Sequence, residues 1–226
     1  MYSLFSLIRS GNRTEAIIFI LSGCFVVFCC TPLHELAHGW VAYKLGDNTA
    51  KNQGRLTFNP IAHIDPIGMA MILLFGFGYA KAVPVNMRNF KKPKRDMALV
   101  GLAGPCANLV LAFVSIFVCY LIAYLLHPNT FTSILVNFFY YSAFINVSLA
   151  AFNLIPIPPL DGSKIIAGVL PDKAYYKYMM YERYAMIALI VILFTGILDK
   201  FLGVVAGALM NFISIIPVLI FGNIIY

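Results

Sequence analysis

The stretch AIIFILSGCFVVFCCTPL, from Ala16 to Leu33, carries no charge and runs directly into His34-Glu35-Leu36-Ala37-His38. Helical composition continues to about Tyr43. A helix that spans a membrane needs about 20 consecutive apolar residues. The stretch therefore predicts a spanning helix that carries two histidines and one glutamate toward its C-terminal end.

The composition of the whole chain agrees with a membrane protein. Hydrophobic residues make up 61% and charged residues 11%, against about 45–50% and about 25% in soluble domains. This balance excludes a soluble enzyme, a disordered chain and a disulfide scaffold. The net charge of +7 then indicates basic loops beside a membrane rather than a nucleic-acid site. The five cysteines form no CxxC pair, so we expect neither disulfides nor a cysteine zinc site.

Two further uncharged runs, Met97–Leu126 and Asn129–Leu160, lie on either side of a tight turn at His127-Pro128-Asn129. Each run is long enough to span a membrane, but the segment Pro156-Ile-Pro-Pro159 prevents regular helix at the end of the second. Upstream, Ile67–Ala80 is apolar but only about 14 residues long and holds three glycines. That length favours a re-entrant or interfacial segment over a full span.

The last two apolar runs, Tyr184–Leu198 and Phe201–Tyr226, are separated by Asp199-Lys200. The predicted fold class is an all-α polytopic membrane protein. It has a three-helix core, a re-entrant, partly extended segment that includes Val83-Pro84-Val85, and two further C-terminal helices. We expect one integral membrane domain over residues 1–226, with its core at about 14–164 and its C-terminal helices at about 179–226.

The HExxH pattern carries the chemistry. His34 and His38 are four residues apart, so both imidazoles lie on one face of a helix and can bind one metal ion. Glu35 lies about 100° around the helix and can take a proton from an attacking water. Each ionisable group inside a membrane is costly, and a metal explains all three whereas an ion pair explains at most one. The pattern therefore predicts a zinc site with Glu35 as general base, as in metalloproteases.

Catalytic zinc takes a third protein ligand and keeps one position open. Asp161 is one candidate, because it follows a Pro-broken segment, although an aspartate there can also cap the next helix. His63 and Asp65 form a second candidate cluster, and three histidines are a known catalytic zinc set. Cys30, one turn before His34, is the third candidate, but a small residue on an apolar face is its plainer interpretation.

The topology favours Asp161 independently. The two histidines and Asp161 lie toward the C-terminal ends of their helices. To bind one metal ion, these ends must face the same side of the membrane. The number of membrane crossings between them must then be even. The two central runs supply two crossings, which requires that Ile67–Ala80 does not span. With these ends inside, thirteen basic residues face the cytoplasm, as the positive-inside rule expects, and three lie outside: Arg9, Arg13 and Lys200. We therefore expect the site toward the cytoplasmic side.

Five segments occur in order along the chain: HELAHGW at 34–40, NPIAHIDPIG at 59–68, VPVN at 83–86, LAGPCAN at 102–108 and NLIPIPPLDG at 153–162. In this order the chain resembles the site-2 protease family of intramembrane zinc metallopeptidases over more than half of its length. It is similar to the short prokaryotic members. The loop between the last two core helices has no room for the PDZ-type domain of some members, and we expect no regulatory domain.

The resemblance implies that His34, His38 and Asp161 bind one zinc ion per chain and that Glu35 is the catalytic base. It also implies regulated intramembrane proteolysis, in which the partner is a transmembrane protein substrate and the location is a prokaryotic cell membrane. We expect the broken segment Pro156–Pro159 and an extended stretch Leu56–Asp65 to line a polar cavity and to offer strand pairing to the substrate.

His63 and Asn153 are candidates to donate a hydrogen bond to the developing oxyanion. For His63 the plainer interpretation is that it satisfies nearby backbone or pairs with Asp65. Two rival functions stay open: a membrane zinc transporter or sensor without protease activity, and an inactive adaptor that binds transmembrane helices. A transporter needs Glu35 as a ligand or proton relay, whereas a protease needs it outside the metal ligands.

Overall fold

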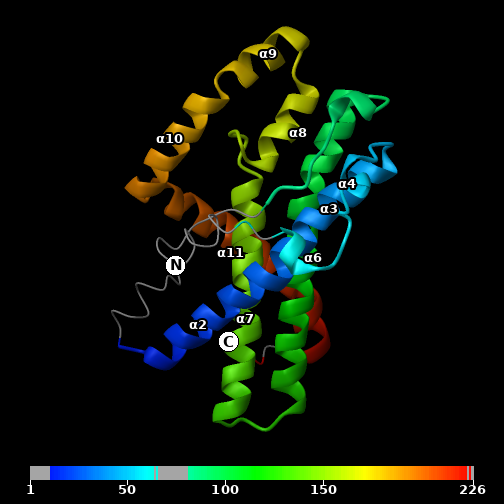
Figure 1. Cartoon of the computed structure of the whole chain (residues 1–226). Coiled ribbons are helices and arrows are strands. Elements are labelled where there is room, and N and C mark those ends of the chain that lie inside the picture. Colours follow the sequence, from blue (N-terminus) through cyan, green and yellow to red (C-terminus); the bar gives the residue numbers. More distant parts are fainter. Residues whose placement is uncertain (1–10, 64, 66–80, 223, 225–226) are drawn as a thin grey trace.

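The computed structural model describes residues 11–63, 65, 81–222 and 224, and every regular element among them is a helix (Figure 1). Within this described part, four helical stretches are long and apolar enough to cross a membrane: Arg13–Lys44, Pro93–Leu125, Thr130–Asn153 and Lys200–Phe221. The predicted class, an all-α polytopic membrane protein, is confirmed.

The first stretch consists of α2 (Arg13–Phe25), a π-helical turn η1 (Val26–Cys30) and α3 (Thr31–Lys44). It begins where the side chain of Asn12 accepts a hydrogen bond from the N–H of Glu15 at 3.3 Å. The π-turn lies directly before Pro32, which has no N–H to donate. There the N–H of Thr31 bonds the carbonyl of Val26, so the helix passes the proline without a break. This π-helical turn was not predicted from the sequence.

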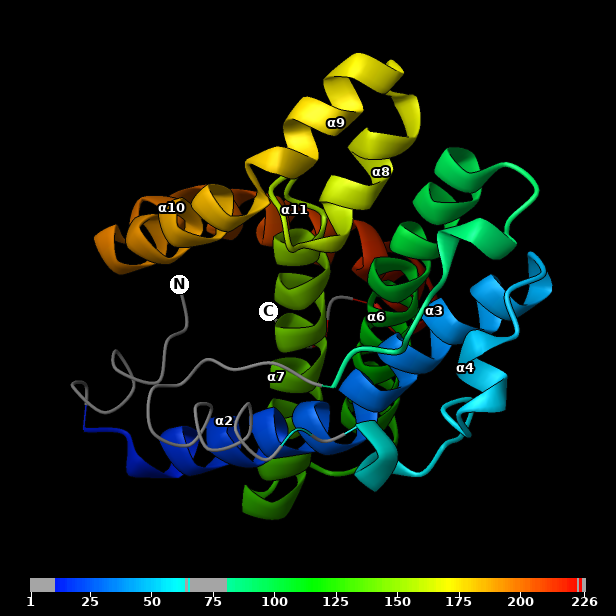
Figure 2. The same ribbon diagram turned by 45° about the horizontal axis from the view of Figure 1, so that its top comes forward.

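The helices α6 (Pro93–Leu125) and α7 (Thr130–Asn153) form a hairpin. At the tip the side chain of Asn129 accepts a hydrogen bond from the N–H of Thr132 at 2.9 Å, which confirms the predicted turn. The C-terminal helix α11 (Ile197–Phe221) packs on both helices around a buried apolar cluster. Figure 2 shows α3 crossing α6 and α2 lying on α7, and these pairs are in contact.

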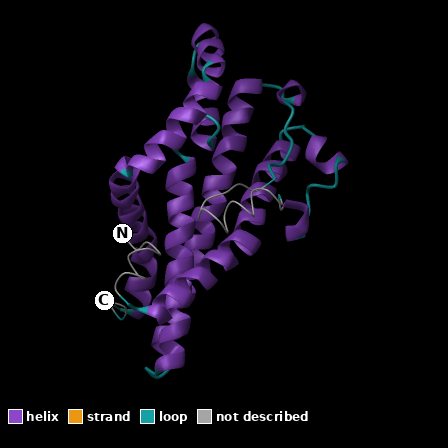
Figure 3. Ribbon diagram, turned by 60° about the vertical axis from the view of Figure 1, so that its left-hand side comes forward, coloured by secondary structure: helices purple, strands orange, loops and turns teal. Residues whose placement is uncertain are grey.

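After α7 the chain passes through a loop with a cis bond between Pro158 and Pro159. It continues into α8 (Asp161–Val169), α9 (Asp172–Met180), α10 (Glu182–Thr195) and α11 (Figure 1). Figure 3 shows the described residues as helices joined by loops. The predicted break at Asp199-Lys200 is wrong, because these residues lie inside α11 and Gly196, with φ of +68°, separates the two helices. A left-handed glycine interrupts a helix, whereas charged residues are tolerated in a first turn.

The segment between α3 and α6 contains α4 (Thr49–Asn52), η2 (Pro60–His63) and η3 (Met87–Asn89). The expectation that Leu56–Asp65 is extended is wrong, since η2 is a 3-10 turn. Residues 81–86, which include the stretch Val83-Pro84-Val85 predicted to be extended, form neither helix nor strand. The predicted re-entrant segment 67–80 lies outside the described residues. Asp47, just after α3, hydrogen-bonds Asn86 and Asn89, just before α6. The chain therefore leaves α3 and enters α6 at the same end of the molecule.

Candidate metal centre

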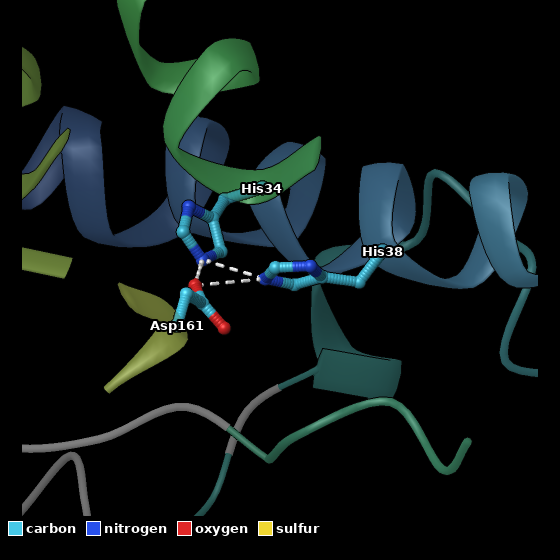
Figure 4. A group of neighbouring side chains, drawn as sticks. All are labelled: His34, His38 and Asp161. Carbon is cyan, nitrogen blue, oxygen red and sulfur yellow. Dashed lines mark hydrogen bonds and ion pairs between the residues drawn. The ribbon is translucent and has the colours of Figure 1, made fainter. Parts of the chain in front are cut away.

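Three buried side chains converge in the core: His34 and His38 from α3 and Asp161 from the start of α8 (Figure 4). The two Nε2 atoms lie 3.0 Å apart. The Oδ2 atom of Asp161 lies 3.2 Å from Nε2 of His34 and 3.1 Å from Nε2 of His38. All three residues are only 5–6% exposed, so the group is shielded from bulk solvent.

Helix α6 closes this group from one side at Gly104. A Cβ atom on Gly104 would lie 2.3 Å from Nε2 of His38 and 2.5 Å from Nε2 of His34, so only glycine permits this approach. One turn earlier, the carbonyl of Val100 accepts a hydrogen bond from Nδ1 of His38 at 2.6 Å. This bond places the proton on Nδ1 and leaves the lone pair of Nε2 directed into the group.

Asp161 is the first residue of α8, and its side chain makes no helix cap. A Cβ on Gly162 would lie 2.3 Å from the carbonyl oxygen of Leu154, so this glycine lets the loop pack tightly under α8. The Oδ1 atom of Asp161 accepts a hydrogen bond from Nζ of Lys164 at 2.8 Å. The positive charge of Lys164 stabilises the carboxylate of Asp161 in its anionic form, which is the form that binds a metal ion.

The donors fit zinc. Two imidazole nitrogens and one carboxylate oxygen, all within 4.8 Å of one another, match a ligand set of catalytic zinc sites, which keep a fourth position open. The hydrogen bond from His38 to a backbone carbonyl is the second interaction that zinc-binding histidines usually make. The lack of a side chain at Gly104 leaves the space beside both Nε2 atoms free.

Glu35 lies beside this group on α3 but is not a member of it. Its Oε2 atom accepts a hydrogen bond from the N–H of Val83 at 3.0 Å. The buried side chain of Val83 packs where Gly39 has none, since a Cβ on Gly39 would lie 2.9 Å from Cγ1 of Val83. Glu35 and Gly39 are one turn apart on the same face of α3. Backbone of the 81–86 segment therefore orients the Glu35 carboxylate.

The other candidate ligands from the sequence, His63, Asp65 and Cys30, do not belong to this group. His63 is 1% exposed, and its Nε2 donates to the carbonyl of Thr57 at 3.0 Å. Cys30 is buried, with 2% of its surface exposed. Asn153 is the last residue of α7 and is half-buried.

Several groups that surround the centre were not predicted from the sequence: Gly104, the Val100 carbonyl, the Val83 N–H and Lys164. Gly104 lies within the LAGPCAN segment, and a glycine in a spanning helix is a known signal of close helix approach. The two backbone groups have no side-chain signal, so no residue pattern announces them.

Comparison with known proteins adds independent evidence. The model of "Peptidase family M50" matches residues 122–198, which include Asp161. "Putative zinc metalloprotease YwhC" of Bacillus subtilis (strain 168) is 47% identical over 165 residues, which are 72% of this chain and 75% of that protein. "Putative zinc metalloprotease Rip2" of Mycolicibacterium smegmatis is 26% identical over 198 residues, 85% of this chain and 73% of that protein. No solved structure gives a significant match.

A third relative comes from an archaeon. "Putative zinc metalloprotease MJ0611" of Methanocaldococcus jannaschii is 31% identical over 157 residues, 66% of this chain and 74% of that protein. These matches confirm the resemblance that the sequence segments carry, and the donor set in the core agrees with a zinc enzyme. The chain therefore belongs to peptidase family M50, the site-2 protease family, and is an integral membrane zinc metalloprotease.

Proposed function

We propose that this protein is an intramembrane protease, which hydrolyses peptide bonds within or near transmembrane segments of other proteins. The observation that carries this proposal is the position of the buried His–His–Asp group. Its two histidines lie within the stretch Arg13–Lys44, which is long and apolar enough to span a membrane. A protein segment that reaches such a site must itself enter the membrane, and a transmembrane helix does so.

We assign His34, His38 and Asp161 as the ligands of one zinc ion per chain. Zinc in such a set lowers the pKa of a water molecule and polarises the scissile carbonyl. Glu35 acts as the general base: its carboxylate takes a proton from the attacking water and passes it to the leaving amine. The hydrogen bond from the Val83 N–H supports this role, because the backbone orients the carboxylate of Glu35 and the carboxylate need not bind the metal to be held in place.

Asn153 stays a candidate donor to the developing oxyanion. It ends α7 directly before the Pro-rich loop that leads to Asp161, and a side-chain amide can donate to such an oxygen. His63 is the weaker candidate, because its Nε2 already donates to the carbonyl of Thr57. We infer that His63 mainly holds the loop between α4 and η2.

The substrate helix must unwind before its backbone can be cut. Two non-helical segments adjoin the proposed machinery: the loop 154–160 leads into Asp161, and residues 81–86 contact Glu35. Non-helical backbone at membrane depth is tolerated where it is buried in protein or lines a water-filled cavity. We propose that these two segments line a polar cavity in which the unwound substrate lies in extended form.

We propose a location in a prokaryotic cell membrane, with the site toward the cytoplasm. Basic residues gather where α3 ends and α6 begins: Lys44, Lys51 and Arg55 on one side and the cluster 91–95 on the other. The hydrogen bond between Asp47 and Asn86 brings these two places together. Under the positive-inside rule this end faces the cytoplasm. We propose one membrane domain over residues 1–226, with its core at about 14–164.

A membrane zinc transporter or sensor is the rival function. It would use Glu35 as a metal ligand or as a relay for ions. The metal-binding group contains His34, His38 and Asp161 without Glu35. This arrangement favours a protease, in which the glutamate must be free to move a proton.

The Glu35→Gln variant tests the proposal. The protein is reconstituted in lipid with a model transmembrane substrate, and zinc per chain is measured beside cleavage. We expect zinc to stay at the wild-type level and cleavage to fall by about 10²–10⁴-fold or more. Glu15→Gln, in the first turn of α2, is the matched control and should keep both. Stoichiometric loss of zinc from Glu35→Gln would make Glu35 a ligand, and undiminished cleavage would exclude it as the base.

A further inference from the structure

The segment Lys81–Phe90, which we call the strap, lies along α3 and carries the N–H group that meets Glu35. At its start the N–H of Lys81 donates to the carbonyl of His63 at 2.9 Å, and the carbonyl of Lys81 accepts from Nη2 of Arg55 at 2.6 Å. At its end Phe90 is 5% exposed and packs between α3 and α6. Both ends of the strap are therefore held by the protein.

Asp47 holds the strap between these ends. It is fully buried and follows Gly46, whose φ of +109° turns the chain beneath the end of α3. Its Oδ2 accepts a hydrogen bond from the N–H of Asn86 at 2.7 Å, and its Oδ1 accepts one from Nδ2 of Asn89 at 2.7 Å. The N–H of Thr49 donates to the same Oδ1 at 3.0 Å. One carboxylate thus ties the start of α4 to two residues of the strap.

The charge on Asp47 suits this task. Burial raises the pKa of Asp47, but its hydrogen bonds outweigh burial, so this pKa lies below its usual range and the side chain is an anion at neutral pH. Hydrogen bonds to a carboxylate are about twice as strong as those between neutral groups. An anion with several backbone and amide donors is therefore a firm anchor.

The strap links this anchor to the catalytic machinery. Val83 lies three residues before Asn86, and its N–H donates to Oε2 of Glu35 at 3.0 Å. The side chain of Val83 packs into the space beside Gly39 on the same face of α3. With the strap fixed at Lys81 and at Asn86, the N–H of Val83 stays opposite Glu35.

We propose that Asp47 is a positioning residue for peptide-bond hydrolysis: it holds the strap on α3 so that the Val83 N–H orients the Glu35 carboxylate. The inference rests on the proposed role of Glu35 as general base. Asp47 is not a member of the metal-binding group, and the hydrogen bonds of its side chain go to Thr49 of α4 and to the strap. Its effect on zinc binding should therefore be small.

Hydrogen exchange and kinetics of Asp47→Asn test the proposal in lipid nanodiscs. This variant keeps the shape of the side chain but replaces one acceptor oxygen by a donor that faces other donors. We expect backbone amides of the strap to exchange about 10–100-fold faster, in the zinc-free and zinc-loaded protein alike. We expect kcat to fall by about 10–100-fold with KM within about threefold of wild type, and zinc content to be unchanged.

Two further variants serve as a control and as a milder disruption of the same anchor. Asn48→Ala changes the exposed neighbour of Asp47, which makes no side-chain cap bond, and it should exchange and cleave like wild type. Asn89→Ala removes one donor to Asp47 and leaves the carboxylate buried with its other partners. It should give a smaller change in the same direction, and it tests the proposal if Asp47→Asn does not fold.

Unchanged strap exchange and unchanged kcat in a folded, zinc-loaded variant would overturn the proposal. So would a loss of kcat that comes with loss of zinc, or with equally faster exchange in α6 and α7, because either result marks a general structural role. The exchange measurement does not depend on the chemistry of Glu35. If Glu35→Gln stays active while Asp47→Asn frees the strap, the proposed base is wrong but the anchoring by Asp47 stands.

Discussion

Replacing Gly104 by alanine should disable the metal centre while α6 stays helical. The added Cβ would lie 2.3 Å from Nε2 of His38 and 2.5 Å from Nε2 of His34, whereas ordinary contact begins at 3.4 Å. Both rings must therefore move by about 1 Å, and a metal site tolerates only about 0.2 Å in its donor distances. His38 cannot retreat freely, because its Nδ1 donates to the carbonyl of Val100 on the same helix at 2.6 Å.

We expect Gly104→Ala to lower zinc affinity by at least about 100-fold, the upper end of what changes around zinc ligands cause. The helix itself should not weaken, because alanine favours helix over glycine by about 1 kcal/mol. Competition with a chromophoric chelator measures the affinity, and circular dichroism checks the helix content. Gly207→Ala on α11, where an added Cβ meets nothing within 4 Å, should bind zinc like wild type. Zinc affinity of a folded Gly104→Ala within about threefold of wild type would refute the reasoning.

Three further outcomes are expected. Asp161→Ala should lower zinc affinity and cleavage together, because two histidines alone are an incomplete ligand set. Normal zinc affinity and normal cleavage would show that another residue is the third ligand, with Asp65 the first alternative. His63→Ala should keep most of its zinc, and zinc loss there combined with normal binding by Asp161→Ala would establish a three-histidine set. The pKa of Asp47 is lower in the folded protein than in the unfolded chain, where it is about 4. The ionised side chain therefore contributes its full stabilisation above about pH 4, and this stabilisation is lost as the pH falls through the folded-state pKa. Thermal unfolding of Asp47→Asn should accordingly lose less stability below about pH 4 than wild type does, and an equally steep loss would contradict this.

The local features of the fold were predictable because they depend on neighbouring residues. The uncharged runs predicted α6 and α7, and the spacing of His34 and His38 predicted two imidazoles on one face of a helix. The turn at 127–129 also followed from its own residues. The break before α11 was predicted at the wrong place. The charged pair Asp199-Lys200 predicted a helix boundary, whereas the boundary is the single glycine Gly196.

The contacts that complete the centre were not predictable in the same way. They depend on where α6 crosses α3, which decides that Gly104 faces the imidazoles and that Val100 offers its carbonyl to His38. The bond between Val83 and Glu35 likewise joins backbone to a side chain far away in sequence. A backbone group is present at every residue, so its use in a site leaves no mark on the sequence.

The order of the proposed ligands along the chain has a consequence for biosynthesis. His34 and His38 belong to α3, whereas Asp161 begins α8 beyond the whole α6–α7 hairpin. While the ribosome is still making the hairpin, the nascent chain holds two histidines and no carboxylate to complete them. With the ligand set proposed above, a half-inserted polypeptide would hold an incomplete zinc site, and each newly made copy would gain its hydrolytic activity only once the hairpin and α8 have been made.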